Sequence, residues 1–463
     1  MNTSNFFSNV TALLTSSLHH SSDLQFRYVE FHGIKLCIAY LETLCNPTNL
    51  DKLLQFLQES EPFEMSDRLD TMSQNYTENV SDTIKGLLSG NFAFFLESNP
   101  ITYLFNGKVS HSRSIEEPSS EKLLQGNHLG FIEDLDTNIY LIRKSLPLPE
   151  ITVKYYHVGA ANTKVAVIYK AGNQTESTLL ELEKRLQLIP DNAPITVGLL
   201  EEWIEDKIWN LFPQILKTEK PDRVISQLHN NGLAIMFEQS STALIIPATF
   251  IEMFHTTDDY TIRWMPASIY RLLRYFAFII ALIAPGFYIS VVSYHFEIIP
   301  SDLILKVKTA VEGIPYPPFI EVMIMSITIE IIVEAGLRMP TGIGQIIGIV
   351  GGLVIGDAVV KAGFISNIMI ITIGITTLSS YIIPYNEMNI AVRLLRIAFS
   401  IAASILGFYG MMLLFLFMII HLCRSTSFNR PFFSLDELLQ VDKILNSIIR
   451  VHAKIANKLG DKL

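Results

Sequence analysis

The sequence predicts a soluble α/β region in its N-terminal part, followed by an all-α polytopic membrane domain. The prediction rests on how charge and apolar runs are distributed. Of 463 residues, 49% are hydrophobic, and the formal net charge is −10. Residues 1–265 hold 20 Lys/Arg and 33 Asp/Glu, whereas residues 266–463 hold 15 and 12. An acidic half therefore precedes a sparsely charged apolar half, and the length indicates more than one domain.

The acidic half contains one pattern twice. The runs KLCIAY (Lys35–Tyr40) and KVAVIY (Lys164–Tyr169) are short and β-prone, as buried strands are. After each run come a helical pattern, a second helix and two strands joined by a polar turn. Aligning the copies makes these residues equivalent: Phe92 and Leu233, Phe94 and Ile235, and Glu97 and Glu238. We predict two related α/β subdomains, with two unrelated α/β pieces as the alternative.

The expected organisation has five parts. They are a flexible leader (1–20), two α/β subdomains (21–145 and 146–262), a transmembrane helical domain (263–423) and a C-terminal tail (424–463). The tail has apolar residues at alternating steps of three and four between Leu438 and Leu459, which predicts an amphipathic helix. Such a helix packs on a partner, self-associates or lies on the soluble domain.

Enzyme motifs are missing from the acidic half. It has no Walker loop, no G-x-G-x-x-G after a strand, no G-x-S-x-G and no H-E-x-x-H. The three cysteines are scattered and form neither a disulfide framework nor a metal-ligand pattern. We interpret the carboxylates Glu201, Glu202, Glu205 and Asp206 as a solvated acidic face rather than an acid/base pair. We expect no enzyme activity, catalytic residue, metal or cofactor, and the acidic charge argues against nucleic acid as a partner.

The apolar half begins with Tyr275–Tyr294, which is long enough to cross a hydrocarbon core of about 30 Å. Further apolar stretches follow at Phe319–Val333, Ile343–Val360, Ile365–Ile383 and Ile397–His421. Hydropathy gives four or five spans, and the side on which the chain ends stays open. Basic residues before the first and last spans, and the lack of a signal peptide, favour a cytoplasmic N-terminal domain. Lys306 and Lys308 mark a loop or an interfacial helix.

One apolar stretch carries four charged residues: Glu321, Glu330, Glu334 and Arg338. An acidic side chain at the bilayer centre costs about 2.5–3.5 kcal/mol, so it normally faces a partner or water. Glu330, Glu334 and Arg338 are spaced by four and share one helical face. They form either an ion-pair ladder near a helix end or a polar seam at a gate. We favour the ladder for Glu334 and Arg338, and both interpretations stay open for Glu330.

The stretch GIGQIIGIVGGLVIGDAVVKAG has glycines at every fourth position: Gly344, Gly348, Gly352 and Gly356. In a membrane, small residues at this spacing let helices approach closely. The opposite side of such a helix carries four other residues: Ile346, Val350, Leu353 and Asp357. This stripe suits a pore wall with an apolar gate and a ring of Asp that favours cations. In the alternative, the stripe faces lipid and Asp357 caps the helix end.

Several motifs carry a resemblance to a known family. In the acidic half they are SSDLQFRYVEF (Ser21–Phe31), SIEEPSSE (Ser114–Glu121), FPQILKTEKPDRV (Phe212–Val224) and IIPATF (Ile245–Phe250). In the apolar half they are RLLRY (Arg271–Tyr275), VVSYHFEIIPSDL (Val291–Leu303), EGIPYPPFIEVMIM (Glu312–Met325), the stretch Glu334–Ser366 and RLLR (Arg393–Arg396). Over nearly its whole length the sequence resembles the A subunit of spore germination receptors, the GerA family of endospore-forming bacteria.

The resemblance implies a nutrient-sensing complex in the inner membrane of the dormant spore. The implied partners are a transporter-like, nutrient-binding B subunit, a lipoprotein C subunit, further copies of the A subunit around an ion-releasing pore, and membrane lipid. Two segments depart from the family's pattern. QGNHLGF (Gln125–Phe131), followed by the acidic Asp136, puts a basic docking surface in doubt, and Asn429–Phe432 begins a different tail.

The leading hypothesis is therefore a non-enzymatic receptor subunit that forms an oligomeric, ligand-gated ion channel. A secondary transporter is one alternative, although the spans show no inverted repeat. The other is a scaffold that only assembles its partner subunits.

Overall fold

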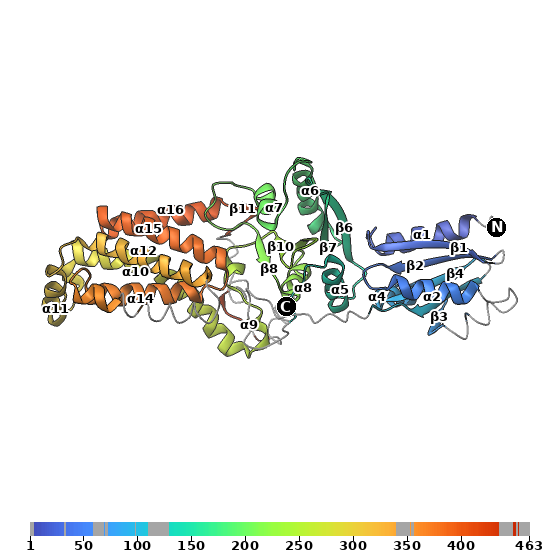
Figure 1. The fold of residues 1–463 in the computed structure, drawn as a ribbon, viewed down its shortest axis with the longest axis horizontal. Helices are drawn as coiled ribbons and strands as arrows, with labels where there is room; N and C mark the ends of the chain where they lie inside the picture. Colours follow the sequence, from blue (N-terminus) through green and yellow to red (C-terminus); the bar gives the residue numbers. More distant parts are fainter. Residues whose placement is uncertain are drawn as a thin grey trace.

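In the computed structural model, two sheet-containing units and a bundle of helices follow one another along a single long axis (Figure 1). The structure describes residues 4–31, 34–58, 69, 73–97, 99–109, 129–338, 352, 356–434, 448–450 and 452. The first unit lies at the N-terminal end, the second in the middle and the helices at the opposite end. The predicted fold class, an α/β N-terminal region followed by helices, is confirmed.

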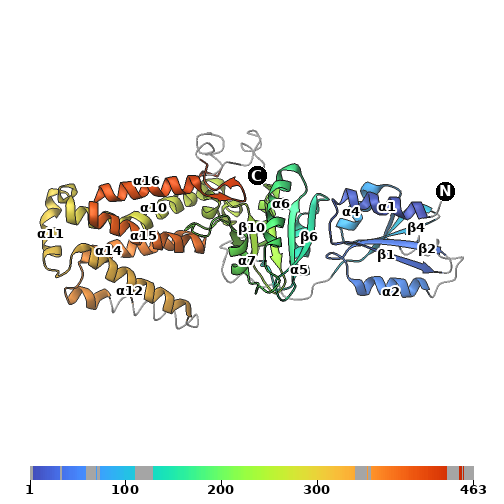
Figure 2. The same ribbon diagram turned by 90° about the horizontal axis from the view of Figure 1, so that it is seen from above.

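The first unit is one antiparallel sheet covered on both faces. Its strands are β1 (Leu24–Phe31), β2 (Ile34–Leu41), β3 (Asn75–Thr77), β4 (Asn91–Leu96) and β5 (Asn99–Asn106), in the order β1-β2-β4-β5-β3. Helices α1 (Ser4–Ser17) and α4 (Val80–Leu88) cover one face, and α2 (Pro47–Gln58) covers the other (Figure 2). Buried residues alternate toward the two faces, as the strand period of two requires.

The second unit repeats this arrangement. Its strands are β6 (Ile151–Val158), β7 (Thr163–Lys170), β8 (Leu216–Thr218), β9 (Leu233–Phe237) and β10 (Ala243–Ile246), in the order β6-β7-β9-β10-β8. Its helices are α5 (Leu135–Ser145), α6 (Asn173–Gln187), α7 (Val197–Ile204) and α8 (Pro221–His229). The two sheets therefore share one strand order, each strand having its counterpart five strands later in the chain.

The strand register confirms the predicted duplication at individual positions. Ile38 lies opposite Phe94 in the first sheet, and their aligned residues Val167 and Ile235 lie opposite each other in the second. The backbone N–H of Glu97 donates to the carbonyl of Lys35 at 3.4 Å. The equivalent N–H of Glu238 donates to the carbonyl of Lys164 at 3.1 Å.

Two expected boundaries differ from the structure. The segment expected to be a flexible leader contains α1, and Leu14 and Leu18 in this segment are buried against the first sheet. Helix α5, expected at the end of the first subdomain, instead packs on the second sheet through Ile139 and Ile142. Apolar periodicity in short helices is a weak local signal, and tertiary packing decides where they lie.

A buried ion pair joins the two units. Arg143 of α5 donates from Nη2 to Asp23 Oδ1 at 2.8 Å, and both side chains are fully buried. Arg143 also donates to the carbonyl of Ile151 at 2.8 Å and to the hydroxyl of Ser21 at 2.9 Å. Asp23 accepts a further hydrogen bond from Thr43 at 2.9 Å. The pair is thus surrounded by hydrogen bonds, which a buried charge needs in order to be tolerated.

The helical part begins directly after the second unit. Its helices are α9 (Asp258–Thr261), α10 (Trp264–Tyr294), α11 (Ser301–Glu312), α12 (Pro318–Arg338), α14 (Asn367–Ile382), α15 (Asn386–Leu406) and α16 (Phe408–Arg424). Within the described ranges, α10 and α15 are long and apolar enough to cross a membrane, and α14 and α16 are shorter apolar helices. Helix α11, which carries Lys306 and Lys308, has no buried residue.

The expected single span Ile397–His421 is wrong, because the chain turns back within it. Gly407 separates α15 from α16 with φ +60°, a backbone conformation that favours glycine. The two helices then pack so closely that a Cβ on Gly410 would lie 2.2 Å from the carbonyl oxygen of Ala402. Tyr294, at the end of α10, closes the turn by donating to the carbonyl of Ser404 at 2.6 Å.

The chain returns to the second unit after α16. The carbonyl of Arg424 accepts from Lys207 Nζ at 2.6 Å, and a hairpin of β11 (Thr426–Ser427) and β12 (Arg430–Pro431) follows. Its turn residues Phe428 and Asn429 have φ +48° and +62°. The Phe428 side chain is buried in the core of the second unit. Residues 425–434 therefore lie at the same end of the bundle as the sheets.

Candidate polar site among the helices

Helices α12, α14 and α15 enclose a polar cavity of about 760 Å³ near the end of the bundle that faces the sheets. Apolar residues such as Ile329 and Val333 form part of its wall. Its polar lining consists of Glu330, Thr377, Ser380, Tyr381, Asn386, Asn389, Arg393 and Arg396. Arg393 and Arg396 lie on one face of α15, because residues three apart in a helix are neighbours.

Glu330 holds both arginines across the cavity. Its Oε2 accepts from Arg393 Nη1 at 2.5 Å, and its Oε1 accepts from Arg396 Nη2 at 3.1 Å. The Arg396 side chain is 4% exposed, Arg393 24% and Glu330 37%. Glu330 therefore forms an interhelical bridge from α12 to α15 and does not join a ladder with Glu334. Sequence spacing could not reveal this, because the partners are 63 and 66 residues away.

Four polar atoms around the cavity have no hydrogen-bond partner among the described residues. They are Thr377 Oγ1, Asn389 Oδ1, Arg393 Nε and Arg396 Nε. Asn389 and Arg396 are more than nine-tenths buried. A buried polar group without a partner costs about 1–3 kcal/mol. The cavity therefore carries unused hydrogen-bonding capacity in an otherwise apolar part of the protein.

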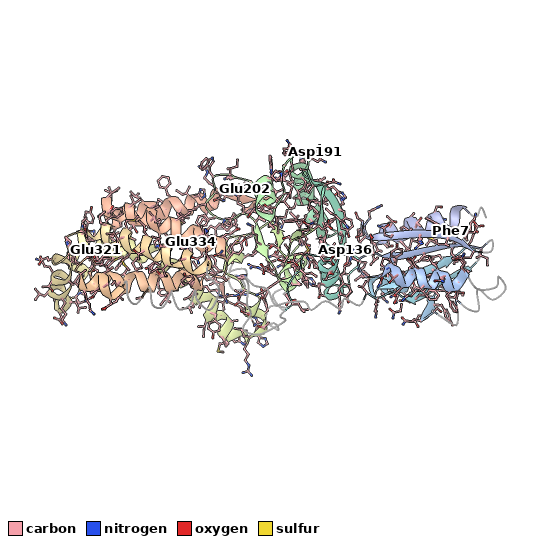
Figure 3. All side chains as sticks on the ribbon, viewed as in Figure 1. Phe7, Asp136, Asp191, Glu202, Glu321 and Glu334 are labelled. Carbon is pink, nitrogen blue, oxygen red and sulfur yellow. The ribbon has the colours of Figure 1, made fainter. Side chains whose placement is uncertain are left out.

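The other charged residues of α12 lie apart from this cavity. Glu334 and Arg338 pair with each other at 2.7 Å on the exposed surface of the helix. Glu321 is fully buried and accepts from the backbone N–H of Ser366 at 3.0 Å. The Ser366 hydroxyl lies 2.9 Å from the Tyr288 hydroxyl, so this contact joins α10, α12 and the start of α14. Glu321 lies farther from the sheets than Glu334 does (Figure 3).

The glycine-rich stretch is described only in part. Gly344, Ile346, Gly348, Val350 and Leu353 lie outside the described residues. Gly352 lines the polar cavity, and a Cβ on Gly352 or Gly356 would meet no described atom within 4 Å. The close packing expected at these two glycines is therefore not seen within the described part of one copy. Asp357 pairs with Lys361 at 2.6 Å, and both side chains are exposed.

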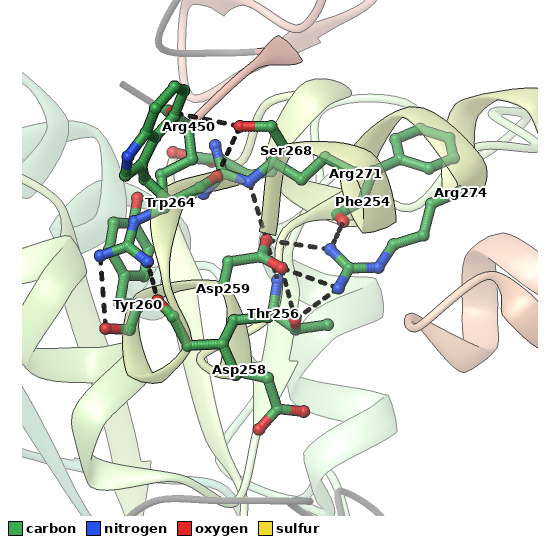
Figure 4. A network of polar contacts seen from close by, with 12 residues as sticks. Phe254, Thr256, Asp258, Asp259, Tyr260, Trp264, Ser268, Arg271, Arg274 and Arg450 are labelled. Atoms are coloured by element: carbon green, nitrogen blue, oxygen red, sulfur yellow. Dashed lines mark hydrogen bonds and ion pairs between the residues drawn. The ribbon is translucent and has the colours of Figure 1, made fainter. Parts of the chain in front are cut away.

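A second polar network joins the second unit to α10 (Figure 4). Buried Asp259 accepts from Arg271 Nε and from Arg274 Nη2, both at 2.8 Å. Arg274 also donates to the carbonyl of Phe254 at 2.9 Å. Burial raises the pKa of Asp259, but the hydrogen bonds and charges of Arg274 and Arg271 outweigh it and hold that pKa below its ordinary value. In the sequence these arginines stand out as basic residues before the first span and as part of the RLLRY motif, but nothing near them indicates their acidic partner.

A third network joins the second unit to α15. Lys217 of β8 forms ion pairs with both Glu201 of α7 and Glu387 of α15. Its backbone N–H donates to the hydroxyl of Tyr385 at 2.9 Å, and that hydroxyl donates to the carbonyl of Ile215 at 3.1 Å. Burial lowers the pKa of Lys217, but the hydrogen bonds that its ammonium group donates to Glu201 and Glu387, together with their charges, outweigh it and raise that pKa. The cavity-lining helix α15 is thus tied to the second sheet at its first turn.

The expected solvated acidic face is wrong for two of its four carboxylates. Glu201 forms the ion pair with Lys217, and Asp206 accepts from Arg185 Nη1 at 2.7 Å. Asp206 also accepts from the hydroxyl of Thr426 at 2.6 Å and from the backbone N–H of Phe428 at 3.0 Å. These partners are distant in sequence, so a local cluster of acids gave no sign of them.

The fold is thus a duplicated α/β region joined by ion pairs to a bundle in which, among the described residues, α10 and α15 are long and apolar enough to cross a membrane. The chain belongs to the Bacillus/Clostridium GerA spore germination protein family, whose profile matches residues 12–459. The family expected from the sequence motifs is thereby confirmed.

Several known proteins are similar to the chain. "Spore germination protein A1" of Bacillus subtilis (strain 168) is 34% identical over 449 residues, covering 96% of this chain and 93% of that protein. "Spore germination protein B1" of the same organism is 42% identical over 330 residues, covering 71% and 68%. The crystal structure of the N-terminal domain of the A subunit of the Bacillus megaterium spore germinant receptor GerK3 has 24% identity and a TM-score of 0.40, covering 52% of this chain and 95% of that chain.

Proposed function

We propose that this chain is the A subunit of a germinant receptor and that several copies form a nutrient-gated ion channel in the inner membrane of the spore. The family match carries the first part of the proposal. The observation that supports a role beyond anchoring is the cavity with Glu330, Arg393 and Arg396, because charges inside membrane helices are costly and usually mark ion or substrate pathways. No enzymatic step is included in this proposal.

Exposed aromatic and apolar side chains support the membrane location. Trp209 is 95% exposed and Ile208 81% exposed, in the loop that contacts the end of α16 through Lys207 and Asn210. Trp264, at the start of α10, is 39% exposed. Tryptophan is enriched at membrane–water interfaces. We place this interface at the junction of the second unit and the helices, with both α/β units on the cytoplasmic, spore-core side.

The contacts of α15 suggest how a signal would reach the helices. A ligand shifts a closed–open equilibrium only if it binds the two states with different affinity. Lys217, Tyr385 and Glu387 connect the second sheet to the first turn of α15, and Arg393 and Arg396 follow on the same helix. A movement of the sheet against the bundle would therefore change the polar cavity. Glu321 and Glu330 are the proposed gate or interface groups.

The pore itself is proposed to form between copies. Ile346, Val350, Leu353 and Asp357 are the proposed pore-lining residues, with the glycines Gly344, Gly348, Gly352 and Gly356 on the packing side. The open space next to Gly352 and Gly356 supports a packing partner from outside this copy. The B subunit, the lipoprotein C subunit and lipid are the other proposed neighbours, and exposed Met412, Leu413 and Phe417 of α16 offer apolar surface for them.

The alternative function is a secondary transporter or an assembly scaffold in the same complex. A charged cavity within a helical bundle is also typical of transporters, whose sites lie between interrupted helices. A substitution in the pore is expected to change conductance in a channel, whereas in a scaffold it would only reduce assembly.

The first test measures potassium release from spores after addition of a mixture of amino acids and simple sugars. Spores would carry the wild-type chain, Leu353→Ala, the control Leu378→Ala on the exposed face of α14, or no copy. A channel predicts that Leu353→Ala leaks or changes the release rate several-fold while Leu378→Ala does not. Release that needs the chain but is unchanged by Leu353→Ala contradicts the pore assignment.

A further inference from the structure

The cavity among α12, α14 and α15 holds one positive charge more than it can neutralise. Arg393 and Arg396 face a single carboxylate, Glu330. The nearest other acids are engaged elsewhere, since Glu334 pairs with Arg338, Asp357 with Lys361 and Glu387 with Lys217. Residues 339–355 contain no Asp or Glu in their sequence. Arg396 is 4% exposed, and an uncompensated charge at so buried a position is unfavourable, so a bound anion is the simplest completion of the site.

The geometry of the guanidinium groups shows which kind of anion fits. Glu330 uses one terminal nitrogen of each arginine, and both Nε atoms stay without a partner among the described residues. The edge formed by Nε and a terminal nitrogen matches two oxygens of a carboxylate or phosphate. We propose that this cavity binds an oxyanion group, a carboxylate or a phosphate, on the open Nε–Nη2 edge of Arg393 and on the Nε of Arg396.

Two further side chains define the rest of the ligand. The hydroxyl of Thr377 is unpartnered and can donate to an oxygen of the anion. The amide oxygen of Asn389, which is 8% exposed, is an unpartnered acceptor and requires a donor on the same ligand, such as a hydroxyl group. A volume of about 760 Å³ accommodates more than a bare ion. The ligand therefore combines an oxyanion with a hydroxyl or another donor.

Two sources provide this chemistry. Asn386, the first residue of α15, lines the cavity, so the site lies near the proposed membrane–water interface. Anionic lipid headgroups and small soluble anions both reach that level. The proposal concerns binding alone and is independent of whether the chain conducts ions, so potassium release and anion binding are tested separately.

The experiment measures the thermal unfolding midpoint of the full-length chain in an uncharged detergent. The probes are sodium phosphate, sodium glycolate as a carboxylate with a hydroxyl group, and phosphatidylglycerol added to the micelles, each against sodium chloride at equal ionic strength. We expect a saturable rise in the midpoint, because a ligand that binds the folded state stabilises it. Saturation by a soluble anion identifies a free ligand, and saturation by the lipid alone identifies a headgroup site.

The variants separate the site from general charge effects. Arg396→Gln is expected to weaken binding about tenfold or more, since it removes a charge-assisted hydrogen bond to the anion. Arg338→Gln removes an exposed arginine outside the cavity and is expected to bind as the wild type does. Asn389→Ala keeps the ion pair intact and gives a second readout if Arg396→Gln does not fold. The proposal is overturned if no probe saturates, or if the folded cavity variants bind with wild-type affinity.

Discussion

The two α/β units share a sheet but differ in what surrounds it. In the first unit, β1 to β5 are covered on both faces by helices of the same unit, and its two apolar cores consist almost entirely of its own residues. In the second unit, the core on the side of α5 and α8 continues without a break into the helical part, through Phe250, Phe254 and Phe278. One copy of the duplicated fold is therefore self-contained, and the other is joined to the bundle.

Equivalent strand positions show where the two units differ. Phe94 pairs with Tyr103, which pairs with Tyr76 in the first sheet, and Tyr76 is 66% exposed. In the second sheet the same positions lead from Ile235 through Leu244 to Lys217, which forms the ion pair with Glu387 of α15. The two sheets therefore share their strand order, while the equivalent edge-strand side chain is exposed in one unit and contacts the helical part in the other.

The largest expected effect concerns the buried ion pair between Arg143 and Asp23, which joins the two α/β units. Arg143→Met leaves Asp23 buried without its cation, and breaking such a pair costs about 3–5 kcal/mol. The matched control is Arg27→Met, which breaks the exposed pair with Asp51 and costs about 0–1 kcal/mol. Limited proteolysis of the full-length chain measures whether the first unit separates from the second. Equal cleavage rates in the two variants would show that the buried pair does not hold the joint.

A smaller effect is expected at the connection to α15. Lys217→Met leaves Glu201 and Glu387 close together without a cation, and we expect a loss of about 1–3 kcal/mol. Tyr76→Ala at the equivalent position of the first unit is expected to stay within about 0.5 kcal/mol. Hydrogen exchange at the first turn of α15 reports the change locally. If Tyr76→Ala and Lys217→Met alter hydrogen exchange at the first turn of α15 equally, Lys217 does not hold α15 to the second sheet.

The duplicated sheets were predictable because their signals are local. Two buried runs and the elements that follow them predicted the duplication, and the alignment of Phe94 with Ile235 and of Glu97 with Glu238 agrees with the register. The turn at Gly407 was not predictable from hydropathy, because Ile405, Leu406 and Phe408 beside it are apolar. The φ of +60° at Gly407 marks the break.

The polar site was predictable only in its parts. Glu330 stood out as a carboxylate in an apolar helix, and the RLLR motif placed Arg393 and Arg396 close together. Their pairing depends on how α12 and α15 pack, which spacing along one helix does not encode. A count of charges in the apolar half would have connected them, because two arginines within a long apolar helix require a counter-charge. Asp259 was missed because its pairing with Arg271 and Arg274 likewise depends on how two helices, α9 and α10, pack together.

The smallest expected effect is a pH dependence confined to the second unit. Burial, together with the charges of Glu201, Glu202 and Glu387, raises the pKa of Glu205 from 4.5 to about 7. A carboxyl group whose pKa is raised in the folded state stabilises it fully below pH 4.5, and this contribution is lost as the pH rises through about 7. Because Glu205 is partly exposed, we expect less than about 1 kcal/mol.

This pH dependence is measured as the fall in the unfolding midpoint of the full-length chain between about pH 5 and pH 8. Glu205→Gln should reduce the fall, since the amide cannot ionise beside Glu201. Glu78→Gln, at an exposed carboxylate of the first unit, should leave it unchanged. An unchanged fall in Glu205→Gln would show that the ionisation of Glu205 is not the source of this pH dependence.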